Sequence, residues 1–190
     1  MRELIVSEFV SLDGVMEAPG GEPGHPHSGW VFDFMSPEQE SYKLDEVHEG
    51  GALLLGRVTY EGFAEAWPGR GGPFADKMNG MPKYVVTSTL SELSWNNSMP
   101  ITGDVAGEIS RLKEGEGGPI LVAGSCTLVH SLVKDDLVDE YRLMVFPVVL
   151  GSGKRVFPET PDKTVLTLAE TRSFVSGVQV HHYRRAPAAG

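Results

Sequence analysis

The hydrophobic and polar positions change their spacing from segment to segment, and the changes predict alternating strands and helices. Short apolar runs with few charges indicate buried strands, at Glu3–Leu12, Ala52–Leu55, Lys83–Thr89 and Pro119–Ala123. The segments between them carry helix signals, and we expect helices from a Ser36 cap to about His48, over Thr59–Trp67, within residues 103–118, and after Gly124-Ser125.

The last third of the chain has no helical period and predicts three strands, within residues 137–150, 164–174 and 177–185. Because the earlier strands alternate with helices, the pattern predicts an α/β fold with a mainly parallel sheet between two helical layers, a three-layer α/β/α arrangement. The C-terminal strands should add antiparallel pairs at one edge. We find no repeat and no linker, so residues 1–185 are interpreted as one domain and 186–190 as a frayed tail.

Two stretches rich in glycine interrupt this pattern. Ala18–Trp30 is dense in Gly and Pro and predicts a long loop, and Gly69–Pro82 predicts a second irregular connection. Long loops inside compact domains are uncommon and are often functional, and a flexible surface loop without a function fits the first stretch equally well.

Composition and charge narrow the class of protein. A formal net charge of -10 argues against nucleic acid or an anionic membrane as the main partner. The single cysteine, Cys126, rules out an internal disulfide framework and fits a reducing compartment. The first residues do not resemble a secretory signal, and no run approaches the roughly 18 apolar residues of a membrane helix. We therefore expect a cytoplasmic protein.

Three predicted strands end in residues suited to binding an anion. Two end in a glycine directly before a helix, at Gly56-Arg57 and Gly124-Ser125, and a third ends in Thr87, Ser88 and Thr89. Ligands of open α/β sheets bind at the carboxyl ends of strands, where glycine permits close approach and helix amides face negative charge. One such turn is more often simple architecture, but three in one sheet favour a nucleotide site.

Other motifs are missing or weak. The chain has neither the G-x-G-x-x-G dinucleotide fingerprint nor a P-loop, although residues 151–154, "GSGK", could form a backbone wall. His181 and His182 should point to opposite faces of a strand, and His25 and His27 have no third ligand, so we expect no metal. Cys126 at a helix start could favour a thiolate, but without a partner base we interpret it as a small buried residue.

Three carboxylates are candidate catalytic groups: Asp13 at the end of the first strand, Asp33 in "GWVFDF" and Glu38 at the first helix. Asp33 stands between Phe32 and Phe34. A carboxyl in an aromatic pocket would have a raised pKa and could hand on a proton, whereas a solvated loop aspartate fits the same sequence.

Four motifs in order carry a family resemblance: "SLDGVM", "LLLGRVTYEGF", "KYVVTST" and "ILVAGSCTLVHSLVKDDLVDEYRLMVFPVVLGSGKRVF". Together they resemble the dihydrofolate reductase-like family, and look closest to its riboflavin-biosynthesis branch, the reductase half of bifunctional deaminase-reductases. The resemblance runs from about Leu4 to Tyr183, and the G-R-x-T-Y-E segment is among its most specific parts. The deaminase half is absent from this chain.

The resemblance implies an NADPH-dependent reductase on a sheet of about eight strands, commonly a homodimer. It implies that Gly56, Arg57 and Thr59 hold the cofactor phosphates and that Thr87, Ser88 and Thr89 lie near the adenosine ribose. The later turn, Gly124-Ser125, would pack against the pyrophosphate and nicotinamide, with Thr127 and Leu128 in the helix under the cofactor.

Two features depart from the family pattern. A glycine pair is reduced to Gly124-Ser125, which leaves the backbone geometry there open. Folate enzymes place the carboxylate that protonates the substrate on the first helix, and its equivalent here is ambiguous between Asp33 and Glu38.

These observations lead to one main hypothesis, an NADPH-dependent reductase of a pteridine- or pyrimidine-like heterocycle, such as 5-amino-6-(5-phosphoribosylamino)uracil or a dihydrofolate. A carboxylic acid or an ordered water would supply the proton. The alternative is a non-catalytic nucleotide- or small-molecule-binding protein that retains the fold. An FMN-binding flavodoxin-like module fits the alternation but not the three C-terminal strands.

Overall fold

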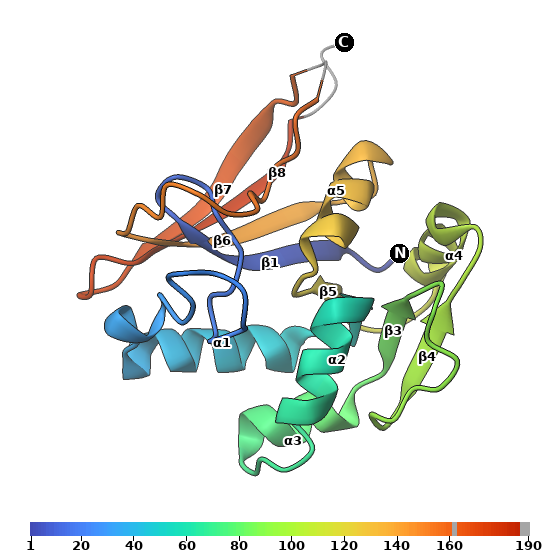
Figure 1. Cartoon of the computed structure of the whole chain (residues 1–190). Coiled ribbons are helices and arrows are strands. Elements are labelled where there is room, and N and C mark those ends of the chain that lie inside the picture. Colours follow the sequence, from blue (N-terminus) through green and yellow to red (C-terminus); the bar gives the residue numbers. More distant parts are fainter. Residues whose placement is uncertain (161–162, 187–190) are drawn as a thin grey trace.

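A computed structural model describes residues 1–160 and 163–186. Its strands are β1 (Leu4–Ser11), β2 (Ala52–Gly56), β3 (Lys83–Val86), β4 (Ser98–Ile101), β5 (Ile120–Val122), β6 (Glu140–Phe146), β7 (Leu166–Ser173) and β8 (Gln179–Arg185) (Figure 1). Its helices are α1 (Pro37–Glu49), α2 (Arg57–Ala66), α3 (Pro73–Gly80), α4 (Val105–Glu114) and α5 (Cys126–Lys134), with a 3-10 turn, η1 (Phe32–Phe34).

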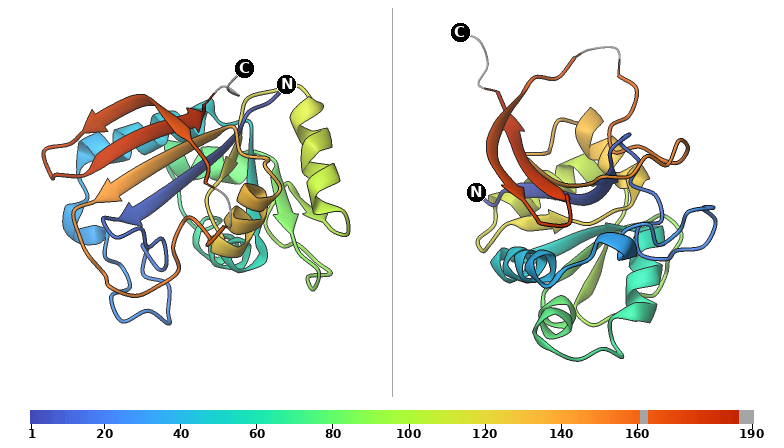
Figure 2. Two further views of the ribbon diagram at one scale, coloured as in Figure 1. Left: turned by 90° about the horizontal axis from the view of Figure 1, so that it is seen from above. Right: turned by 90° about the vertical axis from the view of Figure 1, so that its left-hand side faces the viewer.

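All eight of these strands join one sheet in the order β4-β3-β2-β5-β1-β6-β8-β7. The strands from β4 to β6 in this order are parallel to their neighbours, whereas β8 is antiparallel to both β6 and β7. The predicted parallel sheet with an antiparallel C-terminal edge is therefore confirmed. The sheet is strongly twisted, and the β7–β8 pair bends out of the plane of the parallel strands (Figure 2).

Helices cover both faces of the parallel part, as the alternating pattern predicted. Leu4 and Val6 of β1 point to one face, where they share a core with Ile109 of α4 and Val129 of α5. Ile5, one residue along, points to the other face and packs with residues of α1, α2 and α3. The strand period of two thus separates two cores on opposite sides of β1. Figures 1 and 2 show helices on both sides of the sheet.

Two helix starts follow from local capping. The Ser36 hydroxyl accepts a hydrogen bond from the Gln39 amide at 3.4 Å, and Pro37 occupies the first turn of α1, as predicted. At α4, the Asp104 carboxylate accepts from the Gly107 amide at 3.0 Å. Each cap satisfies an amide that the helix itself leaves free.

The sequence analysis did not predict two elements, because they contain glycine or proline, residues that are typical of turns. Helix α3 lies within the stretch interpreted as a Gly-rich connection, and it buries Ala75 and Met78. Strand β4 is a short, mostly exposed edge strand that contains Pro100, and a proline argues against predicting a strand from sequence. The buried Lys83 holds both in place, since its ammonium donates to the carbonyls of Asn79, Met81 and Asn96.

Only part of the predicted tail is described. The Ala186 amide donates to the Val165 carbonyl at 3.2 Å, and residues 187–190 lie outside the described residues. No helix in the described part of the chain is long and apolar enough to cross a membrane.

Candidate functional site

The turn from β2 into α2 and the turn from β5 into α5 lie against each other at the carboxyl ends of the parallel strands. A Cβ atom added to Gly56 would lie 2.1 Å from the Ser125 hydroxyl, and one added to Gly124 would lie 2.8 Å from the Thr59 hydroxyl. The Gly124–Ser125 peptide bond is cis. Four of the predicted cofactor residues are therefore brought together, and the amino ends of two helices meet there.

Arg57, the first residue of α2, stands beside this junction. Its guanidinium pairs with the Glu61 carboxylate at 2.8 Å, and the two side chains are 43% and 46% exposed. An exposed ion pair of this kind contributes little to stability. Arg57 can thus exchange Glu61 for a phosphate at small cost, which fits the predicted role.

Of the three hydroxyl residues after β3, Thr87 is hydrogen-bonded within the turn, whereas Ser88 and Thr89 face solvent. The predicted strand to Thr89 is too long, because the Thr87 hydroxyl accepts from the amides of Thr89 and Leu90 and turns the chain after Val86. Ser88 and Thr89 are exposed. Since β3 is the neighbour of β2, both lie at the same edge of the sheet as Gly56.

The first turn of α5 exposes one predicted residue and buries another. Thr127 is exposed, whereas the Leu128 side chain is 3% exposed and packs in the core. Leu128 can therefore support the helix but cannot touch a ligand with its side chain. Cys126 is only partly buried and lies 3.3 Å from the His130 ring, so its interpretation as a small buried residue without a partner base is wrong. Burial still raises the pKa of its thiol, which disfavours the thiolate.

Asp13 joins the loop after β1 to the loop after β6. Its carboxylate accepts from the Ser11 hydroxyl at 2.7 Å and from the amides of Leu150 and Gly151. The Ser11 hydrogen bond above all, with the two amides, lowers the pKa of Asp13 to about 2. At neutral pH Asp13 is an anion that fastens two loops, which fits a proton donor poorly.

The same two loops meet again further along the chain. The Glu17 carboxylate accepts from the Lys154 amide at 3.0 Å and pairs with its ammonium, and the His25 ring contacts the Ser152 carbonyl. The "GSGK" turn is thus packed against the first loop, next to the ends of β1 and β6. A role of this turn as a backbone wall for a ligand stays a prediction.

Asp33 and Glu38 are both exposed to solvent. Of the two interpretations left open for Asp33, the solvated loop aspartate is confirmed and the aromatic pocket is wrong, because Trp30 and Phe34 turn inward onto Phe146, with ring centroids 5.3 and 5.9 Å away. A catalytic role for Asp33 or Glu38 stays a prediction.

The sequence analysis missed Glu8, a buried acid in the middle of β1. It is 9% exposed, and its carboxylate accepts from the Gly124 amide at 2.6 Å. Burial raises the pKa of Glu8 to about 8, although the Gly124 amide and the charge of Lys43 lower it. A single glutamate within the apolar run "LIVSEFVS" was the signal that could have identified it.

The register of the sheet explains why Glu8 reaches Gly124. Strand β1 pairs with β5 only from Leu4 to Val6, whereas it pairs with β6 as far as Ser11. Beyond Val122 the chain leaves the sheet toward α5. The second half of β1 therefore has no strand on that side, and the Gly124 amide bonds to the Glu8 side chain instead.

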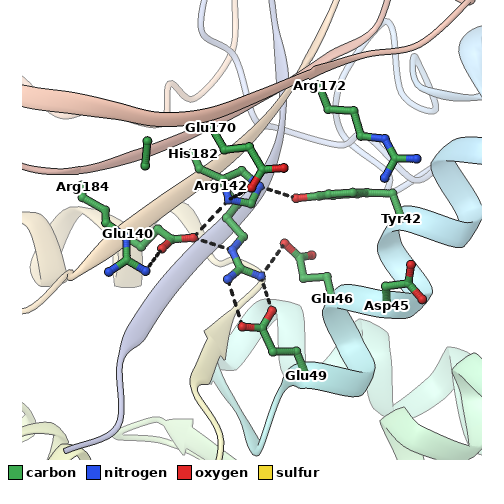
Figure 3. A pocket seen from close by; sticks show the side chains of 11 residues that line it. Tyr42, Asp45, Glu46, Glu49, Glu140, Arg142, Glu170, Arg172, His182 and Arg184 are labelled. Carbon is green, nitrogen blue, oxygen red and sulfur yellow. Dashed lines mark hydrogen bonds and ion pairs between the residues drawn. The ribbon is translucent and has the colours of Figure 1, made fainter.

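A second group of charged side chains, here named the β6–β8 charge cluster, consists of Glu46, Glu49, Glu140, Arg142, His182 and Arg184. It lines a hollow of about 500 Å³ between α1 and the amino end of β6, away from the glycine turns (Figure 3). Arg142 donates to Glu140 at 2.6 Å and to Glu49 at 2.7 Å, and His182 contacts Glu140 and the Tyr42 hydroxyl.

This cluster explains His182 without a metal. His181 contacts Thr171 and stacks on Tyr183, so the two adjacent histidines do face opposite sides of β8, as predicted. In the described part of the chain, no group of three or more His, Cys, Asp or Glu residues is placed to hold a metal ion. The absence of a metal stays a prediction.

The open sheet with its antiparallel C-terminal edge, two helical layers and glycine turns at the strand ends defines a dihydrofolate reductase-like α/β protein. Residues 2–180 match the family model described as the RibD C-terminal domain, and the chain belongs to that family.

Relatives and solved structures agree with this assignment. The chain is 30% identical to the uncharacterized protein YyaP of Bacillus subtilis strain 168 over 189 residues, which covers 96% of this chain and 95% of YyaP. It is 31% identical over 183 residues to YwjB of the same organism, covering 96% and 98%.

Three solved structures share the fold. A Shewanella sp. PV-4 protein described as a riboflavin biosynthesis protein has a TM-score of 0.76 at 20% identity, covering 97% and 99% of the two chains. A pyrimidine reductase-like protein of Corynebacterium diphtheriae gives 0.68 at 10% identity, covering 98% and 92%. Dihydrofolate reductase of Enterococcus faecalis, complexed with NADP(H) and RAB-propyl, gives 0.65 at 17% identity, covering 97% of each chain.

Proposed function

We propose that the protein is an NADPH-dependent reductase of a pteridine- or pyrimidine-like heterocycle. The observation that carries the proposal is the close contact between the Gly56–Thr59 and Gly124–Ser125 turns, where a Cβ on either glycine would collide with a side chain of the other turn, so that two helix amino ends lie together. Membership of the RibD C-terminal domain family supports it, as does the NADP(H) complex of the dihydrofolate reductase that shares the fold.

The residues present fit such a cofactor. Two helix amino ends offer free amides to a pyrophosphate, and Arg57 offers a guanidinium held only by an exposed pair. Ser88 and Thr89 add exposed hydroxyls at the neighbouring strand end, where a ribose or its phosphate would lie. When bound, NADPH would supply the hydride, and the chain's task is alignment and delivery of a proton. A homodimer and a cytoplasmic location are part of the same proposal.

The test is calorimetric titration of the wild-type protein and the Arg57→Ala variant with NADPH and with NADH. Loss of a charged hydrogen-bond partner should weaken NADPH about 10- to 100-fold. If Arg57 meets the 2′-phosphate, the loss should be larger for NADPH than for NADH, and if it meets the pyrophosphate the two losses should be equal.

Arg111→Ala is the matched control, because Arg111 is also an exposed helical arginine paired with a glutamate, on α4. It should bind both nucleotides like the wild type. Failure of the wild type to bind either nucleotide at millimolar concentration would remove the proposal. Tight NADPH binding without hydride transfer to any heterocycle would favour the non-catalytic alternative.

A further inference from the structure

Glu8 is a buried acid at the junction of the two glycine turns, and it forms no ion pair with any of the described residues. In the part of the chain that the structure describes, the Gly124 amide is the one group that hydrogen-bonds its carboxyl, at 2.6 Å. The side chain is nine-tenths buried. Burying a carboxyl costs free energy unless it is paired or protonated, so a glutamate held this way calls for a reason beyond packing.

Glu8 lies beside the turn from β5 into α5, which is proposed above to hold the nicotinamide end of the cofactor. It sits in the half of β1 that β5 no longer covers, and it touches the backbone of the turn proposed to hold the nicotinamide end of the cofactor. The other acids are placed less well for this role, since Asp13 is held ionised by its three donors and Asp33 and Glu38 lie in solvent.

We propose that Glu8 is the proton donor of the reduction, a role that rests on the proposed function. Its carboxyl O–H bond breaks as an N–H or O–H bond forms on the substrate atom next to the carbon that receives the hydride. When bound, NADPH would supply the hydride and be oxidised, and the π electron pair of the substrate C=N or C=O bond would become the N–H or O–H bond that takes the Glu8 proton. The Glu8 carboxylate then takes a new proton from water.

The charged surroundings agree with a carboxyl that carries its proton at neutral pH. Burial raises the pKa of Glu8 to about 8. From α1, the Lys43 charge lowers this pKa and the Glu46 charge raises it, but Lys43 is already paired with Glu46 and bonded to Ser7. From α5, the Cys126 thiol faces Glu8 as an uncharged group, with Glu17 and Lys154 beyond it as a mutual pair.

Glu8 could instead serve only to fasten Gly124, and one substitution separates the two roles. Glutamine in Glu8→Gln keeps the size and the carbonyl oxygen that accepts the Gly124 amide, but it cannot give up a proton at neutral pH. Circular dichroism and NADPH titration first establish that the variant is folded and keeps its cofactor affinity within a factor of about two. NADPH oxidation is then followed in single turnovers with 7,8-dihydrofolate and with 5-amino-6-(5-phosphoribosylamino)uracil as probes.

For a proton donor, Glu8→Gln should slow hydride transfer about 100- to 10,000-fold. The wild-type kcat/KM should fall as pH rises through about 8, where Glu8 loses its proton, and the variant should lack this limb. The control variant Glu108→Gln, on exposed α4, should match the wild type.

The outcomes separate the two proposals. A Glu8→Gln variant with the wild-type rate and the wild-type pH profile would overturn the role of Glu8 and leave the reductase intact. The same holds if Asp33→Asn or Glu38→Gln removes that limb and Glu8→Gln does not. If the wild type fails to bind NADPH, or binds it and reduces neither probe, the reductase function fails and the proton donor fails with it.

Discussion

Glu8 and Glu140 are buried glutamates on the neighbouring strands β1 and β6, and their carboxyls have opposite properties. Burial raises the pKa of Glu8 to about 8. Burial would also raise the pKa of Glu140, but hydrogen bonds from His182 and Arg142 and the charges of Arg142 and Arg184 bring it down to about 2. Partners, rather than burial alone, therefore decide whether a buried acid holds its proton.

The difference extends to the two regions around these residues. In the β6–β8 charge cluster, most charges have an opposite charge within hydrogen-bond distance, as suits a part of the molecule whose task is stability (Figure 3). Around the glycine turns, Glu8 forms no ion pair with any described residue, Arg57 is half-exposed, and Ser88 and Thr89 after the neighbouring β3 are exposed. Functional sites commonly retain such unsatisfied groups, and the rest of the fold compensates for them.

The largest effect is expected from pH acting on Glu8. Below pH 4.5, the ordinary pKa of this acid, Glu8 holds its proton in both the folded and the unfolded chain. Between pH 4.5 and about 8, Glu8 loses its proton in the unfolded chain but keeps it in the folded chain. The free energy of unfolding should therefore fall as pH rises through this window, by roughly 4 to 5 kcal/mol. Glu8→Gln should remove this fall, which urea unfolding across the window measures. If the free energy of unfolding of the wild type and of Glu8→Gln changed with pH in the same way, the raised pKa of Glu8 would be contradicted.

A somewhat smaller effect should follow from breaking the charge cluster. Arg142→Ala removes the partner that Glu140 and Glu49 share, whereas Glu140 keeps His182 and Arg184 and the Glu49 side chain is half-exposed. The cost should therefore be about 2 to 3 kcal/mol, below that of leaving a buried charge wholly unpaired. The exposed control, Arg111→Ala, should cost less than about 1 kcal/mol. Urea unfolding gives both values. Since the cluster lies away from the turns, NADPH affinity of folded Arg142→Ala should not change, and a large loss would refute the separation of the two regions.

The smallest effect on stability is expected at the glycine turns, where binding should suffer more. Gly124 has a φ of +83°, and a Cβ there would press on Thr59, so Gly124→Ala should destabilise by about 1 to 3 kcal/mol and weaken NADPH. Gly62→Ala on α2, where the added Cβ meets nothing within 4 Å, should be neutral or stabilising by about 1 kcal/mol. Calorimetry that finds unchanged NADPH affinity in Gly124→Ala would argue against a cofactor at this turn.

Sequence patterns predicted an element correctly where the spacing of its apolar residues repeated over several turns of helix or several residues of strand. The alternation of apolar strands with helices of clear 3.6 period, such as the one bearing Val105 and Ile109, predicted the layers, and the strand-only C-terminus predicted the antiparallel edge. Helix α3 and strand β4 were missed because they are short and carry Gly or Pro, so that Lys83 and neighbouring strands determine their structure more than local preference does.

The candidate site was predicted in part for the same reason. Glycines before helices are visible in the sequence, so Gly56 and Gly124 could be named in advance. The acids could not be ranked, because Asp13, Asp33, Glu38 and Glu8 are the same chemistry until their neighbours are known. In the structure, backbone amides bind the Asp13 carboxylate, whereas Asp33 and Glu38 are exposed to solvent. Glu8 is buried beside the turn that contains Gly124.

The sequence alone determined the class of fold, the faces of the strands and the presence of glycine turns, because these depend on residue type and on spacing within one segment. Only the tertiary structure decided that Glu8 meets Gly124, 116 residues away, and that Glu140 meets Arg142 and His182. Strand order places β5 beside β1, and the register ends their pairing at Val6, so the environment of the acid follows from long-range contacts that no local pattern contains.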